Sequence, residues 1–306
     1  MKNTKPKVRL WSVLTGLTAI LTVAAIVGNI IANQYATTLN VALNASTYKI
    51  IHGENTGDTE YFKKGFASDE EREAYEAELC ATVEAEGAAL LKNENNALPL
   101  ASGAKVSLFG HGSVDLMYGG TGSGSVDTSK APNFKQALED QDIQVNSTLW
   151  DLYSSDDMMK NYSRITPAAI SDTLEANTQY AVNEAPWSKL SSAESSFADY
   201  GDAAIVVFSR SGGEGADLPS GENGTNDSWI KGQEGDGNYL ALSAEEKELL
   251  QNLKTLKDNG TFKKIIVLIN SSNAIEMDFL NPEICGEDYG IDSAMWIGDV
   301  GQTGIN

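Results

Sequence analysis

Residues 203–217 read Ala-Ala-Ile-Val-Val-Phe-Ser-Arg-Ser-Gly-Gly-Glu-Gly-Ala-Asp, an apolar run that leads directly into a glycine-rich acidic turn. The run from Ala203 to Phe208 predicts a buried strand. In open α/β sheets the carboxyl ends of the strands form the ligand crevice, and glycines let the backbone approach a ligand closely. Glu214 is therefore the first candidate for chemistry. An acidic surface turn is the alternative, because Gly and Asp also favour turns for local reasons.

Strand-like and helical segments alternate along the rest of this region. Apolar periodicity predicts strands at 106–109, 143–145, 203–208, 265–269 and 294–297, and helices at 70–91, 133–139 and 244–256. Ser243 and Glu246 have the spacing of a capping box at the start of the last helix. Strands separated by helices imply an α/β fold, with a mostly parallel sheet flanked by helices on both faces.

The segment 147–200 has no strong period, and we interpret it as a helical insertion. Its aromatic residues could stack on sugar rings, but Tyr and Trp more commonly bury an apolar body and satisfy a polar tip. These residues are Trp150, Tyr153, Tyr162, Tyr180 and Trp187.

The N-terminal region has the pattern of a membrane anchor. Residues 11–32 form an uncharged, largely apolar run, long enough to cross a ~30 Å hydrocarbon core at ~1.5 Å per residue. Basic residues at positions 2, 5, 7 and 9 precede the run, which predicts a cytoplasmic N-terminus. We expect a single-pass protein of the cell membrane whose domain lies on the extracytoplasmic side. A cleaved signal peptide is the alternative, although its apolar core normally has only about 7–15 residues.

The chain is therefore predicted to have three parts: a cytoplasmic tail and transmembrane anchor at 1–33, a connector at 34–68, and a folded domain at 69–306. A net charge of −21 argues against nucleic acid as a partner, because phosphate backbones are bound by clustered Lys and Arg. Cys80 and Cys285 are interpreted as free residues, although the sequence leaves a disulfide between them open. The few His and Cys residues indicate no metal site and no cofactor.

Two glycine-rich motifs follow the first predicted strand, and neither fits a nucleotide-binding loop. Residues 110–115 have Asp115 where a dinucleotide fingerprint needs its third glycine, and residues 119–125 lack the Lys of a P-loop. Ser123 and Ser125 lack the Gly-x-Ser-x-Gly spacing of a serine hydrolase. The glycines of 119–125 instead indicate a loop that passes close to a ligand or a neighbouring domain.

A further loop, 219–238, is rich in Gly, Asn and Asp and carries the carboxylates Glu222, Asp227, Glu234 and Asp236. Carboxylate oxygens bind calcium, but this spacing does not match an EF-hand, and we interpret the segment as a solvated loop. Trp229 is its large aromatic residue, which could cap a bound sugar or pin the loop to the domain surface.

Taken together, six segments resemble glycoside hydrolase family 3, and they occur in the family's order. They are residues 87–100, 106–112, 119–125, the Glu214 turn, 242–250 and 296–304. The resemblance covers roughly residues 69–306 and corresponds to the family's α/β sandwich domain, which accompanies a catalytic (β/α)8 barrel. Each motif is weak alone, but their common order makes the resemblance specific.

The resemblance implies a retaining exo-acting glycosidase of the β-glucosidase or β-xylosidase type, acting on oligosaccharides or glycosides. In this family an Asp on the barrel is the nucleophile and a Glu on the sandwich domain is the general acid/base. Glu214 matches the latter. Arg210, Asp217 and Trp229 are the candidate substrate-binding residues around it.

This chain also departs from the family. It has no Ser-Asp-Trp motif of the kind that carries the nucleophile and no barrel, and its sandwich domain follows the anchor directly. It therefore resembles circularly permuted members, and we expect a product truncated before the barrel and inactive on its own. The alternative is a membrane-anchored carbohydrate-binding or interaction module without catalysis.

Overall fold

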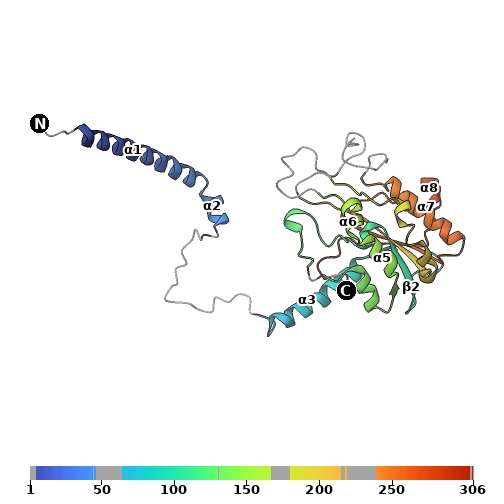
Figure 1. Ribbon diagram of the computed structural model, residues 1–306. Coiled ribbons are helices and arrows are strands. Elements are labelled where there is room, and N and C mark those ends of the chain that lie inside the picture. The colour runs from blue at the N-terminus through green and yellow to red at the C-terminus, as the bar shows by residue number, and fades with distance from the viewer. Residues whose placement is uncertain are drawn as a thin grey trace. The chain divides into compact units, whose positions relative to one another are not determined.

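The computed structural model describes residues 5–43, 45, 64–129, 131–166, 180–214, 218, 239–303 and 305 (Figure 1). The chain divides into two compact units, Met1–Gly65 and Phe66–Asn306.

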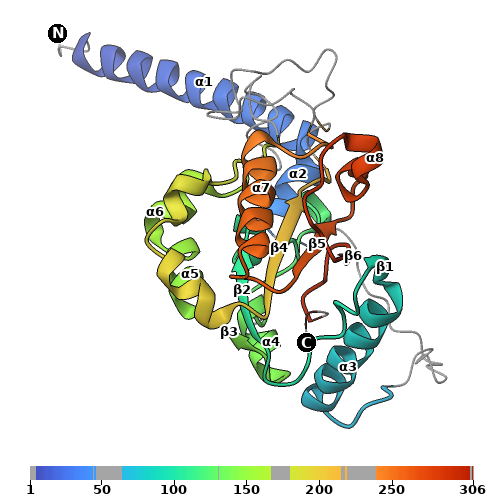
Figure 2. The same cartoon turned by 90° about the vertical axis from the view of Figure 1, so that its right-hand side faces the viewer.

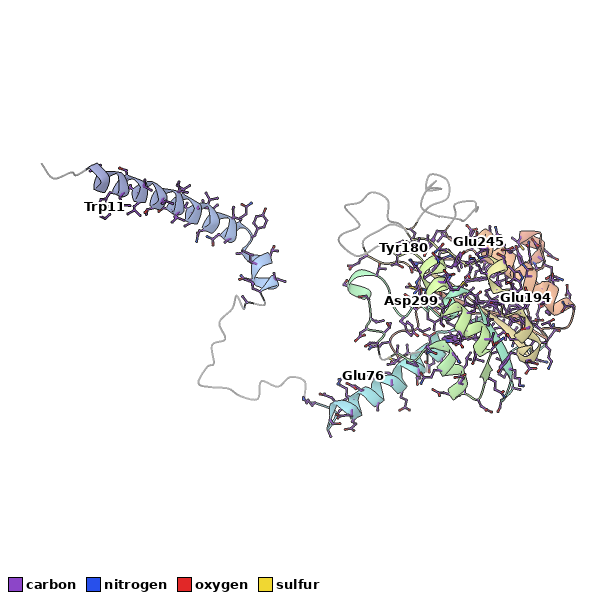
Figure 3. All side chains as sticks on the ribbon, in the orientation of Figure 1. Trp11, Glu76, Tyr180, Glu194, Glu245 and Asp299 are labelled. Atoms are coloured by element: carbon purple, nitrogen blue, oxygen red, sulfur yellow. The ribbon has the colours of Figure 1, made fainter. Side chains whose placement is uncertain are left out.

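The first unit contains the helices α1 (Lys5–Gln34) and α2 (Ala36–Ala42). Within α1, the stretch Leu10–Gln34 has a mean hydropathy of 2.1 and is long and apolar enough to cross a membrane. Trp11, near the beginning of this stretch, is 69% exposed (Figure 3). A signal sequence near the N-terminus can pass the same test of length and hydropathy, so α1 is consistent with both alternatives drawn from the sequence.

The second unit is built on a six-stranded sheet with the order β1-β6-β5-β4-β2-β3. All neighbouring strands are parallel except the edge pair β1 and β6, which is antiparallel. The strands are β1 (Ala89–Asn93), β2 (Lys105–Phe109), β3 (Gln144–Val145), β4 (Ala203–Arg210), β5 (Ile265–Ser271) and β6 (Ser293–Trp296). The prediction of an α/β fold with a mostly parallel sheet is confirmed.

The helices that lie between successive strands of this unit flank the sheet, whereas α3 (Asp69–Gly87) precedes β1 and has no buried residue (Figure 2). The flanking helices are α4 (Phe134–Asp140), α5 (Ser147–Tyr153), α6 (Asp156–Tyr162), α7 (Ala244–Asp258) and α8 (Pro282–Cys285). Short 3₁₀ helices lie between them: η1 (His111–Ser113), η2 (Gly122–Gly124), η4 (Trp187–Leu190), η5 (Glu194–Tyr200) and η6 (Asp278–Leu280).

The central strand β4 is buried along its whole length, because successive side chains point to opposite faces and both faces are covered. Val206 and Phe208 pack into one core with leucines of α7 and aromatics of the segment 187–200. Ile205 and Val207 pack into a second core with side chains of β2 and α4. Two hydrophobic layers thus hold the sheet between helices.

The beginning of α7 is the capping box predicted from the sequence. The Ser243 hydroxyl accepts a hydrogen bond from the Glu246 amide at 3.1 Å, and the Glu246 carboxylate accepts one from the Ser243 amide at 2.8 Å. Since a cap satisfies amides that a helix leaves unpaired, the first turn of α7 is fixed beside the carboxyl end of β4.

Several sequence-based boundaries were wrong, and two of them bear on the sheet edge and on the candidate site. The helix predicted at 70–91 ends at Gly87, and Ala89–Asn93 forms the edge strand β1 instead. Leu90 pairs there with Met295 of β6, a distant partner that local periodicity cannot reveal. The strand predicted at 203–208 continues to Arg210, so that residue lies on β4 and not on the following turn.

The segment 147–200 is helical in part, with α5, α6 and two 3₁₀ helices, but residues 163–166 and 180–186 are not helical, and Ile165 and Ala181 form an isolated antiparallel bridge. Tyr153 and Tyr180 are buried, and Trp187 packs against the first core. Cys80 and Cys285 are both free thiols.

Candidate active site at the carboxyl edge of the sheet

The Glu214 turn and the glycine-rich loop after β2 meet at the carboxyl edge of the sheet. Thr121 and Gly213 form an isolated parallel bridge. The Thr121 amide donates a hydrogen bond to the Gly212 carbonyl at 3.3 Å, and the Thr121 hydroxyl donates one to the Glu214 carbonyl at 3.0 Å. Two motifs far apart in the sequence thus form one surface.

The Glu214 carboxylate is exposed, and one of its oxygens is held by a single residue. Its Oε2 accepts hydrogen bonds from the Ser123 hydroxyl at 2.6 Å and from the Ser123 amide at 2.8 Å. The hydroxyl and then the amide of Ser123 lower the pKa of Glu214, because both stabilise the charged form. The carboxyl group is therefore favoured in its ionised state in this chain.

Glycine is required where the two segments touch. Gly122 has φ +70°, and a Cβ there would lie 2.5 Å from Glu214 Oε2. Gly213 has φ +150°, and a Cβ there would lie 2.5 Å from the Thr121 hydroxyl oxygen. Both positions combine a backbone conformation that side chains disfavour with a contact that leaves no room for one.

The buried side chain of Tyr180 contacts both segments, at Thr121 and at Gly213. The hydroxyl oxygens of Tyr180 and Thr121 lie 2.9 Å apart, and Tyr180 is fully buried (Figure 3). Its ring is tilted against that of Tyr239, with the ring centroids 6.1 Å apart. The polar surface around Glu214 therefore rests on aromatic side chains.

A pocket of about 620 Å³ lies beside this surface, within the size range of small-molecule sites. Arg164 lines it and donates hydrogen bonds to the Asp115 carboxylate at 2.9 Å and to the Leu116 carbonyl at 3.2 Å. The wall that faces the Glu214 turn contains Gly120, Thr121, Gly122 and Thr166. Polar groups and glycines thus line a pocket next to the candidate acid/base.

Arg210, the other predicted site residue that the structure describes, does not line this pocket. Arg210 is fully buried and faces α7, where it is paired with Glu246 at 2.7 Å. Contact between Arg210 and a sugar would require breaking this pair. Asp217 and Trp229 lie outside the described residues, as do the four carboxylates of the loop 219–238.

Sequence reasoning missed two polar residues that follow neighbouring strands. Asn273 follows β5, and Asp299, which is labelled in Figure 3, follows β6. Among the described residues, Asn273 Nδ2 and Asp299 Oδ1 are buried without a hydrogen-bond partner. Burial raises the pKa of Asp299, whose other oxygen accepts a hydrogen bond from the Ser272 hydroxyl at 2.9 Å. Both residues follow a predicted strand, which is the same sequence signal that identified Glu214, so this signal could have indicated them.

Ser123 and Thr121 were also missed as partners of Glu214, and Tyr180 was missed as a partner of Thr121. Ser123 was considered only as a nucleophile, and Tyr180 only as an aromatic residue of the insertion. No local signal relates them to Glu214. Within the described part of the chain, no group of three or more His, Cys, Asp and Glu could hold a metal ion.

The fold and this edge define an α/β domain with an exposed carboxylate at the carboxyl edge of its sheet. A family model described as the glycosyl hydrolase family 3 C-terminal domain matches residues 88–304. The chain therefore belongs to glycosyl hydrolase family 3, as the motifs predicted.

Characterised relatives agree with this assignment. A beta-glucosidase A of Butyrivibrio fibrisolvens is 30% identical over 216 residues, which are 65% of this chain and 23% of the relative. A beta-glucosidase of Ruminococcus albus is 29% identical over 230 residues, which are 74% of this chain and 20% of the relative. The chain thus spans about a fifth of the length of the curated relatives it matches.

Solved structures show the same fold. A beta-glucosidase from Paenibacillus barengoltzii is 25% identical, with a TM-score of 0.54 over 75% of this chain and 22% of that protein. Beta-glucosidase 3B from Thermotoga neapolitana, solved with alpha-D-glucose, is 24% identical, with a TM-score of 0.55 over 78% of this chain and 29% of that protein. The α/β sandwich architecture is therefore shared with β-glucosidases.

Proposed function

We propose that this chain supplies the acid/base domain of a retaining exo-β-glycosidase, of the β-glucosidase or β-xylosidase type, that removes terminal sugars from oligosaccharides or glycosides. Glu214 is the general acid/base. The observation that carries the proposal is its position: an exposed carboxylate on a turn at the carboxyl edge of the sheet, braced by the glycine-rich loop. Relatives named beta-glucosidases support the reaction class.

The chemistry needs a second carboxylate, which the (β/α)8 barrel of a family 3 enzyme would supply. In a retaining glycosidase the two carboxyl groups lie about 5–5.5 Å apart, and one attacks the anomeric carbon. Glu214 would protonate the leaving oxygen in the first step and take a proton from water in the second. An exposed Glu214 fits this arrangement, since its second oxygen makes no hydrogen bond to the described residues.

The proton state of Glu214 must change when the site is completed. Ser123 lowers the pKa of Glu214 in this chain, whereas a general acid must be protonated at the working pH. Burial against a barrel and a sugar would raise that pKa, because desolvation disfavours the charged form. Docking of the barrel would therefore also activate the acid.

The membrane anchor is part of the same proposal. The apolar stretch Leu10–Gln34 supports a single-pass anchor, and the basic residues before it support a domain on the extracytoplasmic side. Such a protein would act on glycosides outside the cytoplasm.

A carbohydrate-binding module without catalysis is the second candidate. Two observations favour it: the pocket of about 620 Å³ next to Glu214, and the ionised state in which Ser123 holds that carboxylate. Measurable affinity of the chain for glycosides, with no hydrolysis after a barrel is supplied, would establish this role.

The test of the enzymatic proposal uses the chain fused to the barrel of a permuted relative. Glu214→Gln should lower turnover steeply for substrates with poor leaving groups. The loss should be much smaller for activated aryl glycosides, because their leaving group departs without protonation. Azide should partly rescue the variant, since a small anion attacks the glycosyl-enzyme without a general base. Glu222→Gln and Glu234→Gln are the matched controls. If either of them, and not Glu214→Gln, lost activity on natural disaccharides, the residue assignment would be wrong.

A further inference from the structure

Arg210 ends β4, four residues before Glu214, and every donor of its guanidinium is used. Nε donates to the Tyr239 carbonyl at 2.8 Å, and Nη1 donates to the Ser209 carbonyl at 3.1 Å and to Glu246 Oε1 at 2.8 Å. Nη2 donates to the Ala241 carbonyl at 2.8 Å and to Glu246 Oε2 at 2.7 Å. Arg210 therefore ties the end of β4 to residues 239–241 and to α7.

The partner of Arg210 is fixed independently. Glu246 is buried, and the capping box with Ser243 holds it in the first turn of α7. Its Oε2 accepts one hydrogen bond from the Ser243 amide and one from Arg210. A bidentate pair with this geometry fixes both the position and the plane of the guanidinium.

Tyr239 extends the constraint to the residue after Arg210. Its hydroxyl accepts a hydrogen bond from the Ser211 amide at 2.8 Å and donates one to the Ser211 carbonyl at 2.9 Å. The Arg210 guanidinium carbon lies 5.7 Å from the centroid of the Tyr239 ring, in a cation–π contact. Both backbone groups of Ser211 are thus held by one buried side chain.

The residues between Ser211 and Glu214 are also held by contacts with other segments. Gly212 packs so closely on Asn273 that a Cβ would lie 2.2 Å from Asn273 Nδ2, and Gly213 is bridged to Thr121. Every residue from Arg210 to Glu214 therefore has a fixed partner. The last link is the contact of the Glu214 carboxylate with Ser123.

We propose that the buried Arg210–Glu246 pair, together with Tyr239, is the positioning element of the acid/base: it fixes the backbone between β4 and Glu214 and thereby holds the Glu214 carboxylate against Ser123. The inference rests on the proposed function of Glu214. It assigns Arg210 to the support of the site, in place of contact with the sugar.

The first test uses the full chain in detergent. Arg210→Met combined with Glu246→Gln removes both charges, and Gln preserves the capping box, so no unpaired buried charge remains to unfold the domain. The pKa of Glu214 is measured by carbon-13 NMR of its carboxyl group, assigned with Glu214→Gln. We expect the lowered pKa of Glu214 to return toward its ordinary value, because the carboxylate leaves Ser123.

The control is the pair Lys257 and Asp292, whose Nζ and Oδ2 atoms lie 2.6 Å apart. It lies at the opposite end of the sheet, where Asp292 Oδ2 also accepts a hydrogen bond from the first amide of β5. Lys257→Met with Asp292→Asn should lower the thermal midpoint without moving the pKa of Glu214. A general loss of stability is thereby separated from a loss of positioning.

Tyr239→Phe is the second variant. It removes the hydroxyl that holds Ser211 and leaves both charges in place, so it answers the same question if the double variant does not fold. In the barrel-completed enzyme, Tyr239→Phe should lower kcat for poor leaving groups by up to about 10²-fold, with little change in KM.

An unchanged pKa of Glu214 and unchanged kcat in folded variants would show that the pair is structural only and would overturn the inference. The proposed function fails by a different result, namely that Glu214→Gln itself keeps normal activity in the completed enzyme. The NMR titration does not depend on activity, so the two failures remain distinguishable.

Discussion

Ser123 donates two hydrogen bonds to the same oxygen of Glu214, from its hydroxyl at 2.6 Å and from its amide at 2.8 Å. One residue of the glycine-rich loop thus determines both the orientation and the charge state of the candidate acid/base. The second oxygen of Glu214 has no hydrogen bond to the described residues, which suits a group that must exchange a proton with a substrate.

Ser123→Ala should raise the pKa of Glu214 toward its ordinary value, because the larger of the two stabilising hydrogen bonds is removed. A carboxylate whose folded pKa is lowered contributes stability above its unfolded pKa, and this contribution disappears as the pH falls through the folded pKa. The thermal midpoints of wild type and variant should therefore differ at neutral pH and converge in acid. Ser125→Ala, in the same loop, is the control and should leave the carboxyl titration unchanged.

Gly122→Ala should displace Glu214 from Ser123. The added Cβ would lie 2.5 Å from Glu214 Oε2, and φ +70° adds a cost of about 1–2 kcal/mol for a residue with a side chain. Gly124→Ala is the matched control, because a Cβ there meets nothing within 4 Å. Equal thermal midpoints and equal Glu214 titrations for the two variants would contradict the described contact.

The chain of 306 residues should not hydrolyse aryl β-glycosides by itself, because an acid/base without a nucleophile cannot form the glycosyl-enzyme. Addition of a family 3 barrel should restore turnover. Hydrolysis by the chain alone, above the uncatalysed rate and abolished by Glu214→Ala, would show that another carboxylate of this chain acts as the nucleophile.

The domain that follows α1 should be released when protease is added to intact cells, because the basic residues before the apolar stretch favour a cytoplasmic N-terminus. Mass spectrometry of the membrane fraction should find the N-terminal residues still attached to the chain. A mature protein that starts near residue 35 would instead identify α1 as a cleaved signal sequence.

Much of the fold could be predicted because it depends on residues near each other in the chain. The apolar run of β4 and the capping box of α7 are local patterns, and the structure has both. The edge strand β1 was missed for the opposite reason. It pairs with β6, about two hundred residues later, and its short apolar stretch continues the helical period of α3.

The sequence by itself determined that this is an α/β domain of family 3 with a carboxylate just past β4, since hydrophobic period and motif order are properties of the linear chain. Only the tertiary structure decided what surrounds that carboxylate. Ser123 lies 91 positions before Glu214, and Glu246 lies 36 positions after Arg210. Such contacts depend on how the sheet brings strand ends together, so only the tertiary structure places Arg210 beside α7, paired with Glu246.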